Sequence, residues 1–417
     1  MAIGRSGIGR DRELATGGGN RLAVESPAVM STRNTRVAVI GGGVVGCAVA
    51  HALARRGVEV VLLEAETALA LGASGTNSGI LHTGFDSPPG ELETRLILRS
   101  AALREELLGE LGVPVWRCGA RLAPDGDDEQ SEVRRLAERA GANGVEARLL
   151  SDGSLTVPGE AVTDPVAFVH ALAAAARAGG TEVRLGTRVS GLSRAPGQEL
   201  LLELVSGEPL RARAAVNCAG LFADEVAHLA GENPVRIYPR KGEFLVFSAP
   251  RGETLERILL PVPGALGKGV LVFPTLDREV VAGPTARERE DKQDWSVEAD
   301  ASELILPRAI RMYPALERAV QIGAYAGLRP AGRDANYVIE ASQTLPWLVH
   351  VAAIRSTGLS ASLGIAEHVV GMLAEQGAIE PRPPRPLPVA PQPTPAGRWW
   401  QRASRHRDES RREATAR

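Results

Sequence analysis

The stretch RVAVIGGGVVGCAVAHALARRGVEVVLLEAE, residues 36–66, constrains the fold more than any other part of this chain. A β-prone apolar run is broken by three glycines, and the helix-forming run that follows closes on two arginines and a glycine. This order predicts a strand over 37–40, a helix over 44–54 and a strand over 58–63, which together form a βαβ unit. The uncharged run is long enough to suggest a membrane span, but its glycines argue against one.

The glycines of this unit have the spacing G-x-G-x-x-G, on Gly41, Gly43 and Gly46. In such a unit the first glycine permits a tight turn, the second lets a diphosphate approach the backbone, and the third lets helix and strand pack closely. Glu64 follows at the end of the second strand, near the spacing of about 20 residues expected for the acid that binds ribose hydroxyls. A purely structural turn is the alternative, but strands, glycines and acid together indicate a site for the ADP half of a dinucleotide.

Composition limits the remaining possibilities. The 417 residues are enough for a large core and predict two interleaved domains. The formal net charge of −2 provides no general attraction for nucleic acid, so no nucleic-acid partner is expected. Cys47, Cys118 and Cys218 form no C-x-x-C pair, so we expect no metal site and no disulfide framework. This cysteine usage favours a reducing cytoplasm, with a peripheral position at the inner face of the membrane as the alternative.

Both ends of the chain are predicted to be disordered. Residues 1–34 lack apolar periodicity and the apolar core of a secretory signal, and Met30 is an alternative start. Residues 379–417 are rich first in proline and then in arginine, with Trp399 and Trp400 between the two parts. A solvated tail is the favoured interpretation, while contact with an anionic membrane or a partner protein stays open.

The part between the tails alternates helices and strands. A loop of small residues over 72–90 precedes a helix over 91–111, and Asp164-Pro165 begins another helix. One strand is expected over 210–217, and residues 236–285 are mostly strand-like. The final elements are a strand in LVHVAAI and a helix that starts near Ser360.

Five segments taken in order resemble the FAD-dependent oxidoreductases of the D-amino acid oxidase superfamily. They are GGGVVG, GTNSGILHTG, DPVAFVHALAAAARAGG with TRV, NCAG, and the pair AGLRP and STGLSAS. Within the superfamily they look most similar to the glycerol-3-phosphate dehydrogenase A-subunit branch and the L-2-hydroxyglutarate oxidases. The resemblance implies a mixed α/β (α+β) fold, in which a Rossmann-like FAD-binding domain is interleaved with a mainly antiparallel β-sheet substrate domain. The FAD-binding parts would be about 35–112, 160–233 and 325–378, and the substrate-binding parts about 113–159 and 234–324.

The resemblance also implies a set of cofactor-binding residues. They are Gly41, Gly43, Val44, Val45, Gly46 and Glu64 for the ADP moiety, Val189 for adenine, Ala219 and Gly220 for the diphosphate, and Ser74, Thr76, Asn77, Ser78, Gly79, Gly327, Gly358, Leu359 and Ser360 for the flavin. A helix that starts near Ser360 would direct its amides at the flavin carbonyl, where negative charge develops on reduction.

Two residues are the candidates for chemistry, because a bound flavin accepts the hydride and leaves the protein to place the substrate and to handle a proton. Arg329 in AGLRP matches the arginine that holds the substrate anion, although a structural arginine is the alternative. His82 in ILHTG can accept a hydroxyl proton, with packing or flavin contact as its alternative role. Arg240, Lys241 and Lys268 stay open as partners of a phosphate, beside the interpretation as solvated strand residues.

We therefore expect an FAD-dependent enzyme that oxidises a small anionic 2-hydroxy compound. Glycerol 3-phosphate is the first candidate and L-2-hydroxyglutarate the second, followed by an amine or amino acid; a catalytically silent flavin-binding subunit is the alternative of another class. Two departures from the family leave the acceptor open among oxygen, a quinone and a partner subunit. A proline-rich tail stands in place of a cysteine-rich domain, and Arg355 stands where relatives commonly have an acid.

Overall fold

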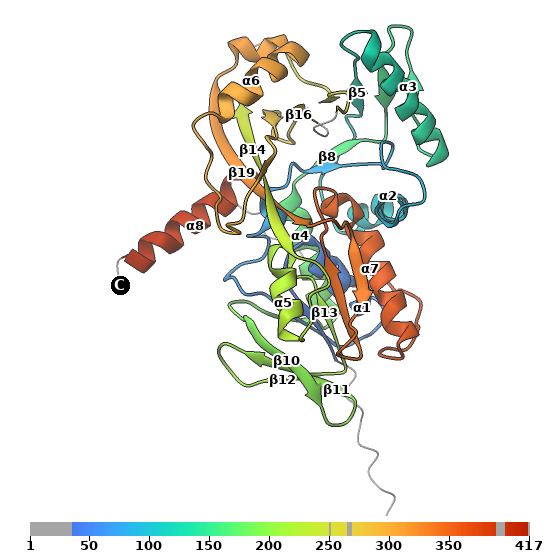
Figure 1. Ribbon diagram of the computed structural model, residues 1–417, viewed down its shortest axis with the longest axis vertical. Coiled ribbons are helices and arrows are strands. Elements are labelled where there is room, and N and C mark those ends of the chain that lie inside the picture. The colour runs from blue at the N-terminus through green and yellow to red at the C-terminus, as the bar shows by residue number, and fades with distance from the viewer. Residues whose placement is uncertain (1–35, 250–251, 265–268, 389–396, 416–417) are drawn as a thin grey trace, which may run out of the picture. The chain divides into compact units, whose positions relative to one another are not determined.

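The computed structural model describes residues 36–249, 252–264, 269–388 and 397–415. The predictions for residues 1–34, for Met30 and for Lys268 lie outside these residues. The mixed α/β fold expected from the sequence is confirmed, with helices packed on a largely parallel sheet beside a larger, mainly antiparallel one (Figure 1).

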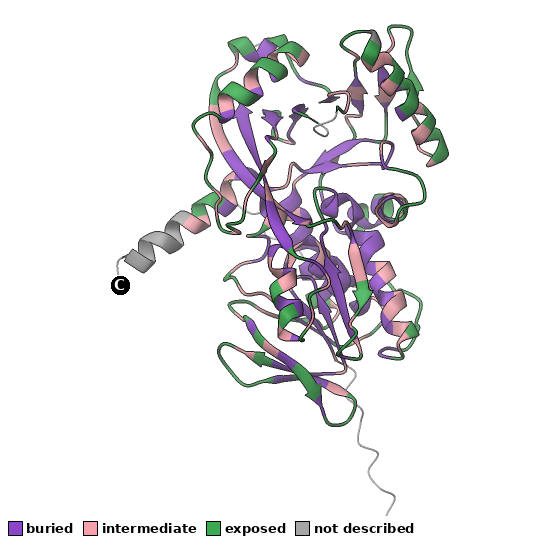
Figure 2. Cartoon of the chain, viewed as in Figure 1, coloured by how far each residue is buried: buried purple, intermediate pink, exposed green. Residues whose placement is uncertain are grey.

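The first sheet has six strands in the order β20-β21-β13-β1-β2-β9. Their bounds are β1 Val37–Ile40, β2 Val60–Leu63, β9 Glu182–Arg184, β13 Ala214–Asn217, β20 Val338–Ala341 and β21 Leu348–Ala352. All neighbours are parallel except β20, which pairs antiparallel with β21. Both faces are covered, which explains the continuous apolar runs seen in the sequence (Figure 2).

Alternate residues of β1 show what covers each face. Val37 and Val39 belong to an apolar cluster that includes the four helices named next, whereas Ala38 and Ile40 pack into a second cluster with a three-stranded sheet. The helices are α1 Val44–Ala54, α2 Leu92–Glu110, α4 Pro165–Ala178 and α7 Gly358–Glu375. The strands are β10 Val189–Ala195, β11 Glu199–Leu204 and β12 Leu210–Ala212, with α5 Ala223–Leu229 beside them.

The prediction of a single strand over 210–217 was wrong. The chain divides at Arg213 into β12, which pairs with β11, and β13, which enters the parallel sheet beside β1. The Arg213 amide donates to the carbonyl of Arg36 at this point. Two strands of different sheets thus follow each other with one residue between them, and a continuous apolar pattern conceals the break.

The second large sheet follows the path β18-β14-β17-β16-β15-β5-β7-β6, and β19 also pairs with β14. The bounds are β5 Ala120–Leu122, β6 Arg148–Leu149, β7 Leu155–Val157, β14 Ile237–Phe247, β15 Ile258–Leu260, β16 Leu271–Pro274, β17 Val280–Gly283, β18 Arg287–Glu288 and β19 Gln321–Gly332. The long antiparallel pair β14 and β19 is its centre, and α6 Ala301–Met312 packs on it through an apolar cluster that includes Leu245 and Ile305.

Short elements join the two sheets. A small sheet has the order β3-β8-β4, and the 3-10 helix η1 precedes it in the loop of small residues. The bounds are η1 Ala73–Thr76, β3 Ile80–Leu81, β4 Val115–Trp116, β8 Ala161–Thr163, η2 Gly220–Phe222 and η3 Pro314–Arg318. Helix α3, Asp127–Ala142, was not predicted. In the part of the chain that the structure describes, no helix is long and apolar enough to cross a membrane.

The prediction of a disordered, solvated tail over 379–417 was wrong for its described residues. The amide of Arg385 donates to the carbonyl of Arg55, and helix α8, Trp399–Thr415, follows (Figure 1). Trp399 and Trp400 are only 3% and 4% exposed. The physical reason is that two adjacent indoles at the start of the helix are buried against the body, so no apolar stripe repeats along the helix for a periodicity argument to detect.

Candidate active site

The first of two adjacent cavities lies at the carboxyl ends of β1, β2 and β13, where ligands bind in open α/β sheets. We name it the Gly41 cavity; its volume is about 580 Å³. Its lining includes the predicted cofactor residues Gly41, Gly43, Val44, Val45, Glu64, Ser74, Asn77, Val189, Ala219, Gly220, Gly358 and Leu359. The structure therefore brings together residues that are up to about 320 positions apart in the sequence.

The three fingerprint glycines have different roles at this cavity. Gly41 has a φ of +111°, and a Cβ atom there would lie 2.4 Å from the carbonyl oxygen of Cys218. A Cβ atom on Gly46 would lie 1.9 Å from the carbonyl oxygen of Gly41, so Gly46 serves the packing of helix on strand and does not line the cavity. Gly43 precedes the first residue of α1 and lines the cavity, where it leaves the helix N-terminus open to a diphosphate.

Glu64 lies at the end of β2 and lines the cavity, as the fingerprint requires. Its two carboxylate oxygens accept hydrogen bonds from the amides of Gly42, at 2.5 Å, and Glu66, at 2.8 Å. Burial raises the pKa of Glu64, and these hydrogen bonds oppose the increase. The amides fix the carboxylate in place, and its remaining lone pairs can accept from ribose hydroxyls.

Gly79 and Ser360, which were predicted to contact the flavin, also have structural roles. Gly79 has a φ of +77°, and a Cβ atom there would lie 2.4 Å from the carbonyl oxygen of Thr163. The Ser360 hydroxyl accepts from the His82 amide at 2.8 Å and donates to the carbonyl of Ile80. Ser360 thereby ties α7 to β3, and the helix begins two residues earlier than predicted, at Gly358. Gly358 and Leu359 at the start of α7 line the Gly41 cavity, and Thr357, which precedes the helix, lines the second cavity described below.

The second cavity, which we name the Arg329 cavity, lies between the β14–β19 pair and the loop of η1 and β3. It has a volume of about 1380 Å³ and shares the lining residues Ala73, Asn77 and Arg355 with the Gly41 cavity, so the two cavities are adjacent. The predicted residues that line it are Thr76, Asn77, Ser78, His82, Arg240, Gly327 and Arg329. Several predicted cofactor residues and both catalytic candidates therefore line the same cavity.

His82 forms a pair with a buried acid that the sequence did not reveal. The Nδ1 atom of His82 lies 2.8 Å from Oε2 of Glu160, whose side chain is 0% exposed. The other carboxylate oxygen accepts from the Thr83 amide and from the Thr83 hydroxyl. Burial by itself would raise the pKa of Glu160, but the His82 charge and the hydrogen bonds from His82 and Thr83 lower it below its usual value. Glu160 is thus an anion that orients the His82 ring, which leaves Nε2 as the nitrogen available to the cavity.

Three arginines converge on the same cavity. Arg240 of β14 and Arg329 of β19 are cross-strand partners in the antiparallel register, and Arg355 lies before α7. Burial, together with the charges of Arg240 and Arg355, lowers the pKa of Arg329 to about 10. Like charges on neighbouring strands are unfavourable unless an anion joins them. Arg355 is therefore a third cation of this cavity.

The three arginines differ in the hydrogen bonds and ion pairs that they form within the protein. Arg329 donates to the backbone carbonyls of Arg240, Lys241 and Thr285 at 2.9 to 3.2 Å, so most of its donors hold strands together. Arg355 lies 3.6 Å from Glu93. In the described part of the chain, the Arg240 side chain has no ion-pair partner.

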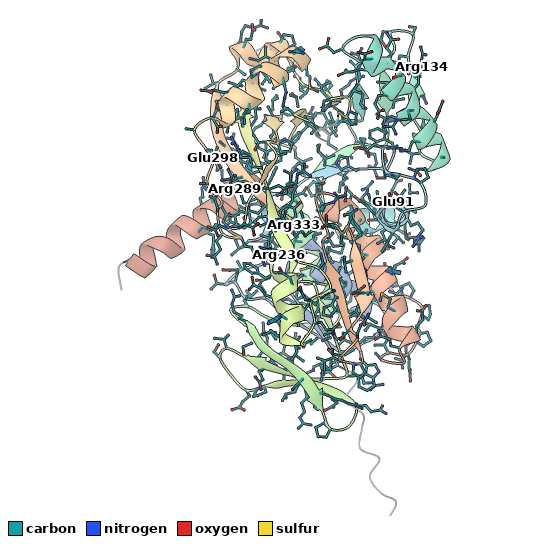
Figure 3. All side chains as sticks on the ribbon, viewed as in Figure 1. Glu91, Arg134, Arg236, Arg289, Glu298 and Arg333 are labelled. Atoms are coloured by element: carbon teal, nitrogen blue, oxygen red, sulfur yellow. The ribbon has the colours of Figure 1, made fainter. Side chains whose placement is uncertain are left out.

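Lys241 points into a different environment. It is fully buried, and its Nζ atom contacts Asp294 at 2.8 Å and Glu298 at 3.5 Å. Figure 3 labels Arg289 and Glu298, which also form an ion pair in this segment. This network neutralises the charge of Lys241, which removes it as a candidate for binding a substrate anion.

The two adjacent cavities fit a flavin dinucleotide. Gly43 leaves the N-terminus of α1 accessible, and a Cβ atom on Gly327 would lie 2.8 Å from the carbonyl oxygen of Thr76. The Thr76 hydroxyl is buried and has no hydrogen-bond partner among the described residues, so it can donate to or accept from a group bound there. Residues 36–372 match the protein family described as FAD dependent oxidoreductase. The chain belongs to this family.

Known proteins of this family cover most of the chain. It is 30% identical over 354 residues to a glycerol 3-phosphate dehydrogenase of Caloramator mitchellensis, a match that covers 81% of this chain and 73% of the relative. It is 27% identical to an L-2-hydroxyglutarate dehydrogenase of Escherichia coli, over 66% of this chain and 70% of the relative. The solved structure of L-alpha-glycerophosphate oxidase from Mycoplasma pneumoniae with FAD bound superposes with a TM-score of 0.78 at 25% identity, covering 86% of this chain and 98% of that one. The protein is an FAD-dependent oxidoreductase.

Two residues beside His82, Glu160 and Arg104, were not predicted from the sequence, because only tertiary contacts identify them. Glu160 stands in PGEAV without any pattern that marks it, and its role depends on β8 pairing with β3 beside His82. Arg104, on the buried side of α2, donates to the His82 carbonyl at 3.2 Å. Its place in the helix gave a signal in principle, since an arginine on an apolar face requires a buried partner.

Proposed function

We propose that this protein oxidises the secondary alcohol of glycerol 3-phosphate and transfers the hydride to FAD. The observation that carries the proposal is the convergence of Arg240, Arg329 and Arg355 on the cavity that His82 lines. Guanidinium groups bind phosphate through paired charge-assisted hydrogen bonds, and a dianion offsets the mutual repulsion of several of them.

Arg240 is the principal phosphate partner in this proposal. Its side chain has no ion-pair partner in the described residues, whereas three donor contacts of Arg329 are made to backbone carbonyls. Arg329 then holds β14 and β19 in register beside the anion. It contributes mainly its positive charge, because most of its N–H donors are already bonded to backbone carbonyls. The role first expected for Arg329 from the sequence is thereby divided between two cross-strand neighbours.

His82 is the general base. Glu160 accepts a hydrogen bond from Nδ1–H, which fixes the tautomer in which Nε2 is unprotonated and can accept the hydroxyl proton of the substrate. Bound FAD supplies the hydride acceptor. The alcohol thus loses a hydride from carbon and a proton from oxygen, and becomes a ketone. The arginines orient the substrate so that its reacting carbon faces the flavin-binding residues Thr76, Asn77 and Gly327.

L-2-hydroxyglutarate is the second candidate, because two separate arginines can each bind one carboxylate and a relative is named for that substrate. The electron acceptor that reoxidises the flavin is a separate question. Mixing reduced enzyme with oxygen and, separately, with a soluble quinone compares the two small acceptors directly.

Anaerobic mixing of the yellow holoenzyme with glycerol 3-phosphate, glycerol or L-2-hydroxyglutarate tests the proposal, with flavin bleaching as the signal. We expect glycerol 3-phosphate to reduce the flavin fastest. Arg240→Met should slow that reduction at low substrate by about 30-fold or more, the loss expected from about 2 kcal/mol or more for a partner of a desolvated charge. Reduction by glycerol should change little, because glycerol has no anion to lose a partner.

Arg121→Met is the matched control. Arg121 lines the same cavity, but its guanidinium is already paired with Asp152 at 2.6 Å. The rate with glycerol 3-phosphate should stay within about threefold of the parent, since no substrate contact is removed. Equal rates with glycerol and glycerol 3-phosphate, or no effect of Arg240→Met, would contradict phosphate binding by these arginines. Faster bleaching by L-2-hydroxyglutarate would establish the second candidate instead.

A further inference from the structure

Helix α8 is docked through a slot that the body of the protein provides. The Trp399 ring meets the Tyr325 ring edge-on, with centroids 5.4 Å apart, and Trp400 Nε1 donates to Oε2 of Glu279 at 2.8 Å. Arg398 forms an ion pair with the same carboxylate. At Gly323 of β19, a Cβ atom would lie 2.5 Å from the Trp400 ring, so the absence of a side chain there makes room for the indole. The fit on both sides indicates a specific docking site.

The docked helix supplies part of the wall of the Gly41 cavity, because His406 and Arg407 both line it. His406 Nε2 lies 3.0 Å from the Thr67 hydroxyl, and Arg407 donates to the carbonyl of Leu71. Thr67 and Leu71 belong to the segment that follows β2, which also carries cavity-lining residues. The C-terminal helix is therefore fastened directly to the rim of the cofactor site.

Arg407 also contacts a second segment of that rim. Its guanidinium lies 3.7 Å from the ring centroid of Trp295, which lines the same cavity and belongs to the segment between β18 and α6. A guanidinium stacked on an indole is a favourable contact, stronger where water is excluded. One side chain of α8 thus joins two wall segments that are more than 200 positions apart in the sequence, and places a positive charge at a cavity whose ligand carries a diphosphate.

We propose that α8 is a retaining element of the FAD site: the helix closes part of the Gly41 cavity, and FAD leaves only after His406 and Arg407 release the rim. The cofactor's release should therefore be slowed by contacts that lie outside the βαβ fingerprint. This inference depends on FAD binding in the Gly41 cavity and not on the identity of the substrate.

Two variants of the full chain test it from different sides. Gly323→Val fills the slot of Trp400 without changing α8 or any residue that lines the Gly41 cavity, and valine suits a strand. Arg407→Gln leaves the docking site intact and removes the bridge between Leu71 and Trp295. The matched control is Arg405→Gln, which changes an exposed arginine of the same helix whose partner is Gln401.

The measurement is the rate of FAD release, followed as the increase in flavin fluorescence after dilution of each purified holoprotein, with no substrate present. We expect release to be about 10-fold faster or more in Gly323→Val and about threefold to 10-fold faster in Arg407→Gln, with Arg405→Gln within twofold of the parent. Tryptophan fluorescence of Gly323→Val reports whether α8 has left its slot.

An unchanged rate of FAD release in Arg407→Gln overturns the proposal. This result is decisive even if Gly323→Val fails to fold. So does unchanged release in Gly323→Val once its tryptophans are exposed. Equal acceleration in Arg405→Gln would overturn it as well, since a general loss of positive charge would then explain the effect. A protein that binds FAD but is reduced by none of the hydroxy compounds would contradict the proposed function and leave this inference standing.

Discussion

Glu160→Gln isolates the role of the buried carboxylate beside His82. The amide oxygen of glutamine can keep both hydrogen bonds from Thr83, but its NH2 group takes the position of Oε2, 2.8 Å from His82 Nδ1. Two donors cannot face each other, so Nδ1 must become the acceptor and the ring proton moves to Nε2. The nitrogen that faces the cavity is then unable to accept the substrate's proton.

The expected loss is that of a general base, about 10²- to 10⁴-fold in the rate of flavin reduction, or roughly 3 to 5 kcal/mol in the barrier. The assay is anaerobic stopped-flow reduction by glycerol 3-phosphate at saturating substrate, with the flavin content of each variant measured from its absorbance. Flavin content should equal that of the parent, because Glu160 lines neither cavity.

Thr83→Val is the control, because it removes the hydroxyl donor to Glu160 and leaves the pair of His82 and Glu160 in place. It should lower the free energy of unfolding by about 1 to 2 kcal/mol while the reduction rate stays within about threefold of the parent. The reasoning is refuted if Glu160→Gln reduces as fast as the parent, or if Thr83→Val loses as much rate as Glu160→Gln.

Three further predictions concern the cofactor site, the substrate site and stability. Gly46→Ala should abolish FAD binding or folding, judged from bound flavin and circular dichroism, because its Cβ atom would overlap the Gly41 carbonyl at 1.9 Å. Arg355→Gln should raise the glycerol 3-phosphate concentration for half-maximal reduction about threefold to 30-fold, with a smaller effect on the limiting rate, since it removes one charge of the anion site. Burial lowers the pKa of His51 to about 4, so the neutral ring stabilises the fold above pH 6.5 and this contribution is lost as the pH falls toward 4. Over that pH range the free energy of unfolding, measured by denaturant titration, should fall by up to about 3 kcal/mol less in His51→Leu than in the parent.

Local sequence patterns predicted the elements around the cofactor well. The helix over 44–54 has its predicted bounds, and Asp164 caps α4 by accepting from the amides of Val166 and Ala167. Both depend on short-range rules, namely glycine turns, apolar runs and cap residues. The glycine spacing with Glu64 likewise located the Gly41 cavity, because the geometry of a βαβ unit is fixed within one stretch of sequence.

The substrate side was less predictable because its residues meet only through the fold. Arg240 and Arg329 become neighbours through the register of two strands, and Glu160 reaches His82 through the pairing of β3 with β8. The sequence marks Arg355 only as a departure from the family pattern, whereas its position beside both cavities gives it a role. The docking of α8 was missed for a similar reason, since Gly323 marks the slot for Trp400 from a distant strand.

The position of α8 in the chain has a consequence for how the protein is synthesised. Every other described wall of the Gly41 cavity precedes α8 in the sequence, so a ribosome completes the βαβ unit, β13 and the start of α7 before it makes Trp399. A growing chain therefore presents the nucleotide site before its last wall exists. Synthesis proceeds at about 5 to 20 residues per second, so the interval before α8 emerges lasts seconds. If α8 retains FAD as proposed, FAD can enter in that interval before the helix covers part of the cavity, and cofactor supply during translation would then influence how much of the protein matures as holoenzyme.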